Sequence, residues 1–172
     1  MFTKMLVAAL AVIVSGCAGM QPVSEADRTF DGVFEAPGFS KDQIFTATKI
    51  WIAEHFRSAK SVIEYENKED GTLIGNGIIP YPCSSALECL GKPNWMIPFT
   101  MRVDMKDQRF KLTFSNIRLS WPPSYNSTFG AQSGHDAPVS RQSDLDAIKP
   151  KLLNFGGDIV TSIRNNSGSK NF

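Results

Sequence analysis

Residues 94–105 alternate between two kinds of side chain over a dozen positions, and no other stretch of the chain is patterned so regularly. One set is Trp95, Ile97, Phe99, Met101, Val103 and Met105, and the other is Asn94, Met96, Pro98, Thr100, Arg102 and Asp104. A period of two over this length predicts a long β-strand with one buried face. Because proline has no amide hydrogen to donate, we expect Pro98 where no ladder bond is needed, such as a bulge.

The next strand is predicted over residues 109–119, after a short turn. Its first half places Phe110, Leu112 and Phe114 on one side, but the apolar positions that follow are out of phase with these. A one-residue shift of this kind is what a β-bulge produces, so we expect a bulge near Ser115 or Asn116.

Three weaker strand patterns precede the long strand. Residues 62–67 and 72–79 flank the turn at Gly71, where glycine tolerates the positive φ of a hairpin turn. In the first of these strands the alternation puts Ile63 and Tyr65 on one side and two glutamates on the other, wet side. Residues 29–35 give a modest strand pattern that ends at a Pro-Gly pair.

Two helices complete the pattern. Ser40 and Gln43 have the spacing of a capping box, and the apolar residues of 41–57 then recur at helical intervals. Residues 144–165 also have apolar residues three and four apart. Here we expect a kinked element, because Pro150 can begin a new helical segment after a break and two adjacent glycines weaken the middle.

The order of these elements predicts an α+β fold: strand, helix, four strands, helix. Short turns make neighbouring strands antiparallel, so we expect a curved antiparallel sheet of about five strands, with both helices on one face. The opposite face would mix Arg102, Arg109 and Lys111 with Glu64, Glu66 and Asp104. Such a mixture is typical of a solvated face and not of a phosphate cradle, so we expect no nucleic-acid binding.

Several short segments resemble a known family over about residues 30–163. They are Ile50-Trp51-Ile52-Ala53, Asp70-Gly71 followed by Ile74-Gly75-Asn76-Gly77, Met101 to Asp104 and Arg109 to Phe114. Together they resemble an uncharacterised family of bacterial envelope proteins with a TATA-binding-protein-like fold. That family has no established activity, so the resemblance implies a fold and no functional residues.

The N-terminus has the features of a bacterial lipoprotein signal. Lys4 is followed by ten uncharged residues, 5–14, which are too few to span a bilayer, and then by Val14-Ser15-Gly16-Cys17. This quartet resembles a lipobox, in which the cysteine thiol receives a diacylglycerol and becomes residue one of the mature protein. Ala18 after it is typical of sorting to the outer membrane, facing the periplasm. The alternative is an ordinary secretory signal with a chance cysteine.

These features divide the chain into a signal peptide (1–16), a lipidated tether (17–28), one α+β domain (29–165) and a polar tail (166–172). The whole chain has 18 basic and 17 acidic residues, and Lys4 is the only charge in the signal, so the mature chain is balanced. This balance gives no electrostatic attraction to nucleic acid. In an exported protein Cys83 and Cys89 are expected to form a disulfide, with a metal site as the less typical alternative at this spacing.

Residues 122–142 are rich in Ser, Gly, Asn and Pro, which predicts a long connection of low complexity. Aromatic residues in and beside this connection are the best candidates for partner contact, because they supply binding area at low entropic cost. The candidates are Tyr81, Trp121, Tyr125 and Phe129. The alternative is that these rings fold back and cap the open end of the sheet.

The sequence contains no recognisable catalytic motif, and we expect neither catalysis nor a metal or cofactor. The favoured hypothesis is a lipid-anchored binding or structural module that holds an envelope protein or ligand. An envelope hydrolase that uses His55 or His135 as its base, and a small-molecule or lipid carrier, are the alternatives.

Overall fold

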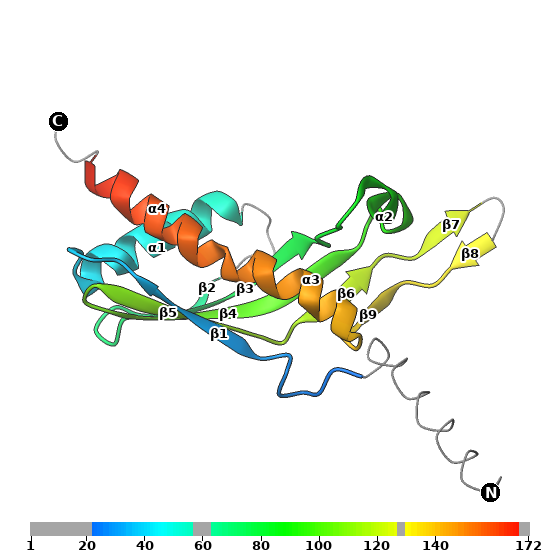
Figure 1. Ribbon diagram of the computed structural model, residues 1–172, viewed down its shortest axis with the longest axis horizontal. Coiled ribbons are helices and arrows are strands. Elements are labelled where there is room, and N and C mark those ends of the chain that lie inside the picture. The colour runs from blue at the N-terminus through cyan, green and yellow to red at the C-terminus, as the bar shows by residue number, and fades with distance from the viewer. Residues whose placement is uncertain (1–21, 57–62, 127–129, 169–172) are drawn as a thin grey trace, which may run out of the picture.

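The computed structural model of the chain describes residues 22–56, 63–126 and 130–168 (Figure 1). Its strands are β1 (Phe30–Glu35), β2 (Ile63–Asn67), β3 (Thr72–Pro80), β4 (Met96–Lys106), β5 (Arg109–Ser115), β6 (Arg118–Trp121), β7 (Ser124–Asn126), β8 (Gly130–Gln132) and β9 (His135–Pro138). Its helices are α1 (Lys41–His55), α2 (Ala86–Gly91), α3 (Gln142–Leu153) and α4 (Phe155–Gly168).

The main sheet has the strand order β1-β5-β4-β3-β2, and every pairing in the described residues is antiparallel. At the N-terminal end of β4, Met96 pairs with Ser120 of β6, and β6 also pairs with β9. These two strands bring the main sheet to seven strands. A separate ribbon of β7 and β8 projects beyond it (Figure 1). The predicted α+β class and the five strands β1 to β5 are confirmed, and the additional strands come from residues 118–138.

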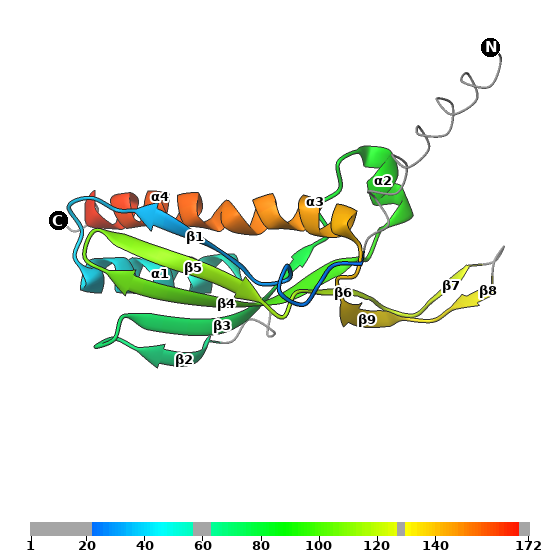
Figure 2. The ribbon, with the colours of Figure 1, turned by 60° about the horizontal axis from the view of Figure 1, so that its bottom comes forward.

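Helices α1, α3 and α4 cover one face of the sheet, as predicted (Figure 2). Phe155, the first residue of α4, contacts the Trp51 ring of α1 and the Phe99 and Phe114 rings of the sheet, with centroid separations of 5.2, 6.1 and 6.2 Å. The space between α1 and the sheet beside Gly77 is only about 10 Å³, room for one water at most. This part of the interior is therefore too small for a ligand.

The long strand β4 alternates as its sequence predicts, with its core-facing residues all buried. Pro98 lies opposite Ile78 of β3. On the other side of β4 it has no register partner, because pairing with β5 ends at Thr100 and pairing with β6 occurs at Met96. The missing amide donor is therefore accommodated at a gap in the ladder.

The predicted bulge after β5 is confirmed. Between the register pairs Thr100–Ser115 and Met96–Ser120, β4 advances four residues while the opposite chain advances five. Asn116 has a φ of 50°, in the left-handed region where Asn is one of the best-tolerated non-glycine residues. The extra residue turns the strand and changes the phase of its buried positions.

The predicted faces of β2 are wrong beyond Ile63. A register shift between Ile63 and Tyr65 puts Tyr65, 48% exposed, opposite Ile74 on the open face of the sheet. Glu66 consequently lies on the helix side, opposite the buried Leu73, and its carboxylate is 2.6 Å from the Lys49 ammonium of α1. A one-residue bulge reverses every following side chain in a strand, and the sequence carries no obvious sign of it.

The predicted start of α1 is confirmed, whereas the predicted position of the break in the last helix is wrong. The Ser40 hydroxyl accepts a hydrogen bond from the Gln43 amide, and the Ser40 amide donates to the Gln43 side chain, so the predicted capping box is present. The last helix does break, but at Asn154, and Pro150 lies inside α3. Backbone hydrogen bonds from Asn154 to the Pro150 carbonyl and from Asp158 to the Asn154 carbonyl keep the two segments continuous.

Residues 122–142, predicted as a long connection, contain three strands. Trp121 of β6 pairs in register with His135 of β9, and Tyr125 of β7 pairs with Ala131 of β8. The composition of this stretch is typical of a loop and gives no sign of the β6–β9 pairing, whose partners run from Trp121–His135 to Arg118–Pro138 and are distant in sequence.

Candidate functional site

The rings of Tyr81, Trp95, Trp121 and His135 form a continuous series at one end of the main sheet, and we call this group the aromatic end. Trp95 and Trp121 stack with their centroids 4.4 Å apart, and His135 stacks on the other face of Trp121 at 4.1 Å. Tyr81 meets Trp95 edge to face at 5.7 Å. Two residues predicted from the sequence, Tyr81 and Trp121, are thus brought into one cluster by Trp95.

Strand ends position these rings. Tyr81 follows β3 and Trp95 precedes β4, and the Tyr81 amide donates a hydrogen bond to the Trp95 carbonyl at 2.9 Å. Trp121 is the last residue of β6 and His135 the first of β9, and the two are register partners. Side chains directly opposite each other in an antiparallel pair lie close enough to stack.

The four rings differ in exposure. Tyr81 is buried, so it caps the sheet, in agreement with the alternative interpretation of the aromatic residues. Trp95 and Trp121 are half-buried, and His135 is exposed. The surface available to a partner is therefore the outer part of the Trp95–Trp121–His135 stack. Trp95 is not among the predicted contact residues, because its place in the alternation of residues 94–105 indicates an ordinary core residue.

A polar network holds the aromatic end against α3. The Tyr81 hydroxyl donates to Asp144 at 2.7 Å, and Asp144 is itself buried in the first turn of α3. The Lys92 ammonium lies 3.8 Å from the centroid of the Tyr81 ring, 2.7 Å from Glu88 and 3.8 Å from Asp144. A cation between two carboxylates and over an aromatic face is stabilised by all three contacts.

Three groups of this network titrate away from their ordinary values. Burial, with the neighbouring Asp144 carboxylate, raises the pKa of Tyr81 above 10.0. Burial alone would lower the pKa of Lys92, but its interactions with Glu88 and Tyr81 outweigh that effect and raise it. Hydrogen bonds from Lys92 and then from Ser84 lower the pKa of Glu88 to about 2. The network therefore keeps Lys92 and Glu88 charged and Tyr81 neutral over the physiological range.

The loop between β3 and β4 is closed by a disulfide, as the sequence predicts. Cys83 and Cys89 are bonded, with their Cα atoms 5.5 Å apart. The loop contains the short helix α2, whose N-cap Ser85 accepts a hydrogen bond from the Glu88 amide. A depression of about 410 Å³ lies between this loop and Trp95, with Tyr81 and both cysteines in its lining.

The remaining predicted contact residues lie apart from the stack. Tyr125 is 79% exposed on the β7–β8 ribbon, which projects from the same end of the molecule (Figure 1). Phe129 and the predicted lipid-attachment residue Cys17 lie outside the described residues.

The two histidines considered as catalytic bases have other contacts. The His55 Nδ1 atom is 2.9 Å from the Trp51 carbonyl oxygen, and its ring stacks on Trp51 at 4.6 Å. The Asp136 carboxylate, next to His135 in the sequence, binds Arg118 and accepts a hydrogen bond from its Nε atom at 2.7 Å. That hydrogen bond holds the pKa of Asp136 below its usual value. This geometry pairs neither histidine with a carboxylate.

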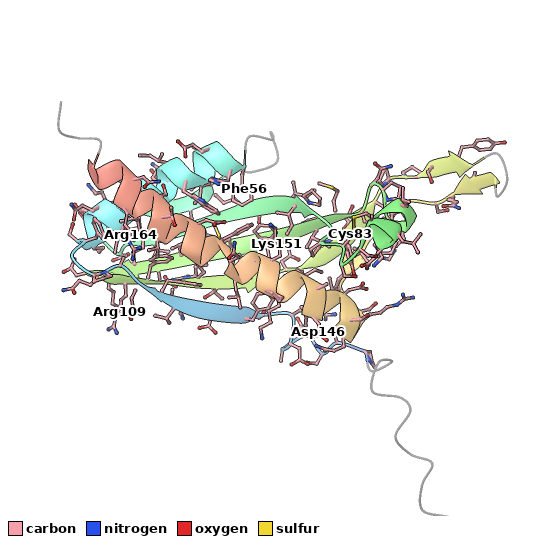
Figure 3. All side chains as sticks on the ribbon, turned by 45° about the horizontal axis from the view of Figure 1, so that its top comes forward. Phe56, Cys83, Arg109, Asp146, Lys151 and Arg164 are labelled. Carbon is pink, nitrogen blue, oxygen red and sulfur yellow. A yellow bond between two sulfur atoms is a disulfide. The ribbon has the colours of Figure 1, made fainter. Side chains whose placement is uncertain are left out.

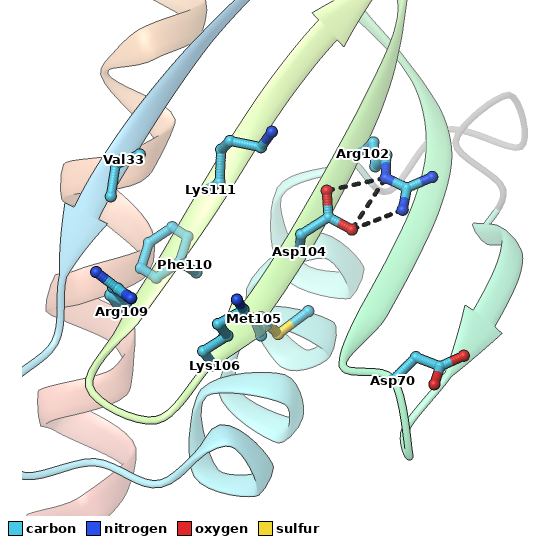
Figure 4. Close-up of a pocket in the computed structure, with 9 residues that line it drawn as sticks. All are labelled: Val33, Asp70, Arg102, Asp104, Met105, Lys106, Arg109, Phe110 and Lys111. Atoms are coloured by element: carbon cyan, nitrogen blue, oxygen red, sulfur yellow. Dashed lines mark hydrogen bonds and ion pairs between the residues drawn. The ribbon is translucent and has the colours of Figure 1, made fainter.

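The open face of the sheet contains a broad, shallow depression of about 480 Å³ (Figure 4). Arg102 is bound to Asp104 through two of its nitrogens, and this contact lowers the pKa of Asp104. Lys111 lies opposite Asp104 in the register, and Lys106 lies opposite Arg109. The charges are mixed, as the sequence predicts for a solvated face.

Within residues 22–56, 63–126 and 130–168, no three His, Cys, Asp or Glu side chains are arranged to hold a metal ion. No helix in this part of the chain has the length and apolar character needed to cross a bilayer.

Comparison with known proteins identifies a family. A family model described as a domain of unknown function (DUF4468) with TBP-like fold matches residues 30–120. No curated protein matches significantly. A crystal structure of a DUF4468 family protein from Bacteroides ovatus is similar with a TM-score of 0.52 and 17% identity, covering 83% of this chain and 88% of that one. A crystal structure of a TBP-like protein from Parabacteroides distasonis is similar with a TM-score of 0.58 and 16% identity, covering 80% of this chain and 92% of that one. At these identities the two structures support the fold alone.

Proposed function

The chain belongs to the DUF4468 family with a TBP-like fold, and we propose that it acts as a lipid-anchored binding or structural module of the bacterial cell envelope. In this proposal Cys17 carries the lipid, the outer membrane holds the chain on its periplasmic side, and the aromatic end contacts a partner protein or ligand. No catalytic step is part of the proposal.

The anchor is supported by the sequence and by the redox chemistry of the fold. The lipobox-like quartet ends at Cys17, after an apolar run that is too short to span a bilayer. The Cys83–Cys89 disulfide requires an oxidising compartment, such as the periplasm, to persist. Two or three acyl chains on one residue would hold the protein on a membrane durably.

The single observation that carries the binding role is the half-open stack of Trp95, Trp121 and His135. Rings that are held rigidly by strand ends lose little entropy when a partner covers them. Tyr125 on the neighbouring ribbon adds a ring that is largely exposed at the same end of the molecule.

Mass spectrometry of the processed N-terminus tests the anchor. We expect a diacylglycerol thioether on Cys17 and no residue before it. A free thiol at Cys17, or cleavage at another position, would disprove this part of the proposal.

Site-specific photocrosslinking in cells tests the binding surface. A photoreactive residue at Tyr125 should give a defined adduct, and the same adduct should disappear when Trp121→Ala is added. The matched control is a photoreactive residue at Val33, which is also exposed but lies on the open face of the sheet. Adducts of equal yield from both positions, or an adduct insensitive to Trp121→Ala, would argue against a specific site at the aromatic end.

A further inference from the structure

Helix α2 directs its large apolar side chains away from the domain and its charged side chain toward it. Leu87 is 80% exposed and Leu90 is 76% exposed, and their spacing of three residues puts both on one face of the helix. The charged residue of this helix, Glu88, is turned toward the domain, where it pairs with Lys92 at 2.7 Å. Two large aliphatic side chains are thus presented to the surroundings where a soluble surface helix would present polar ones.

The loop that carries these leucines is held in place. The Cys83–Cys89 disulfide closes its base, and the Glu88 carboxylate accepts hydrogen bonds from the Ser84 amide at 2.8 Å and the Ser84 hydroxyl at 2.7 Å. Lys92, just after the helix, is bound to Glu88. Because this network restrains the helix, the leucines are kept away from the core and remain available to an outside apolar phase.

The chain enters the domain at the same end of the molecule as this loop, on the other side of the start of α3 (Figure 1). Pro22 forms a bridge with Arg141, and the Val23 amide donates to the Ser140 carbonyl at 3.0 Å. One helical turn from Arg141, the Asp144 carboxylate is 3.8 Å from the Lys92 ammonium. Contacts with the start of α3 therefore connect the entry point of the chain with Lys92 at the end of α2.

The tether is too short to separate this loop widely from a membrane. Five residue steps lie between Cys17 and Pro22. Fully extended, they span at most about 18 Å. An acyl chain on Cys17 would therefore keep the entry point, and with it the end of the molecule that carries α2, near the lipid surface.

We propose that Leu87 and Leu90 insert into the same leaflet that holds the lipid on Cys17, as a second, protein-built contact with the bilayer. This inference rests on the anchor proposed above. The occupant that we propose is lipid, because the tether would hold this end of the molecule at a bilayer. The Glu88 charge is already paired with Lys92, so the insertion does not desolvate an unpaired carboxylate.

Fluorescence quenching in vesicles tests the insertion. The lipidated full-length protein is reconstituted into phosphatidylethanolamine and phosphatidylglycerol vesicles, with or without bromine on the acyl chains. Leu90→Trp and, separately, Leu87→Trp serve as reporters, and the signal of the parent protein with its own tryptophans is subtracted. Interfacial insertion of 5–10 Å would bring each added indole near the brominated chains, so we expect a loss of about half or more of the added emission.

Val33→Trp is the matched control. Val33 is also a large aliphatic residue, 60% exposed, and it lies near Arg109 on the open face of the sheet (Figure 4). Figure 3 shows Arg109 and Cys83 toward opposite ends of the molecule. The control tryptophan should emit equally in the two kinds of vesicle.

The outcomes separate this inference from the anchor. Mass spectrometry of the same sample reports whether Cys17 is acylated. If Cys17 is acylated and both leucine-site reporters emit equally in brominated and plain vesicles, the insertion is refuted while the anchor stands. If Cys17 carries no acyl chain, both are refuted.

Discussion

Replacing Trp121 with alanine should remove the centre of the aromatic end. The Trp121 ring lies between Trp95 at 4.4 Å and His135 at 4.1 Å, and the interplanar angles are 11° and 16°. Among the described residues no other ring contacts both of these neighbours, so the substitution breaks both stacked contacts at once. The pairing of β6 with β9 also loses one of its cross-strand side-chain contacts, that between Trp121 and His135.

The expected loss of stability follows from these contacts. A partly buried aromatic ring contributes about 1–2 kcal/mol through the apolar area that it removes from water. Each stacked pair adds about 0.5–1.5 kcal/mol beyond the area term. Since the two pairs share one ring and are not fully additive, we expect a total loss of about 2–4 kcal/mol. For a domain of this size, that corresponds to a fall in Tm of about 6–12 °C.

Circular dichroism of the protein in detergent measures both parts of the prediction. Thermal unfolding gives the change in Tm, and the near-ultraviolet spectrum should lose the coupled signal of the Trp95–Trp121 pair. Tyr125→Ala is the control, because this ring is 79% exposed and its removal should change stability by less than about 0.5 kcal/mol. A Trp121→Ala protein with unchanged Tm and an unchanged aromatic spectrum would show that the stack does not form.

Three further experiments test other parts of the structure. The pKa of Glu88 is lowered from 4.5 to about 2, so its stabilising effect is present above pH 4.5 and is lost as the pH falls toward 2. Urea unfolding at pH 7 and pH 3 should therefore show that the unfolding free energy falls less on acidification in Glu88→Gln than in the parent protein. Replacing both Cys83 and Cys89 with serine should lower the unfolding free energy by about 2 kcal/mol, measured by urea denaturation, and an unchanged midpoint would mean that the bond is not formed. Gly77→Ala should lower the unfolding free energy by about 1–3 kcal/mol, because the new Cβ would clash with the buried ring of Phe99. Gly157→Ala on the open side of α4 should be neutral or stabilising by up to about 1 kcal/mol. Equal urea unfolding midpoints for these two variants would contradict the packing described for β3.

The sheet and its covering helices could be predicted because their side-chain periods each allow one solution. The alternation through β4 has only one arrangement that buries Phe99, Met101 and Val103 together, and the shift after Phe114 could be explained only by an inserted residue. The capping box at Ser40 is equally local, since its partners are three residues apart. Patterns that are complete within a few residues are readable without tertiary information.

The aromatic end could be predicted only in part because it depends on contacts distant in sequence. Tyr81 and Asp144 are 63 residues apart, and nothing near either residue indicates the other. The pairing of β6 with β9 is concealed by a composition typical of loops, and the bulge that puts Tyr65 on the open face leaves no mark on the alternation of β2. In each case the deciding interaction is a tertiary one that outweighs the local preference.

The attachment of the N-terminal segment has a mechanical consequence. Tension on the tether would act first on the Val23–Ser140 hydrogen bond and then along the axis of β1, an edge strand that pairs with β5 from Phe30 to Glu35. A pull along a strand loads all of its ladder bonds together in shear, which resists force far better than opening them one at a time. Under the proposed function, this arrangement would help the domain to stay folded when a partner and the membrane are drawn apart.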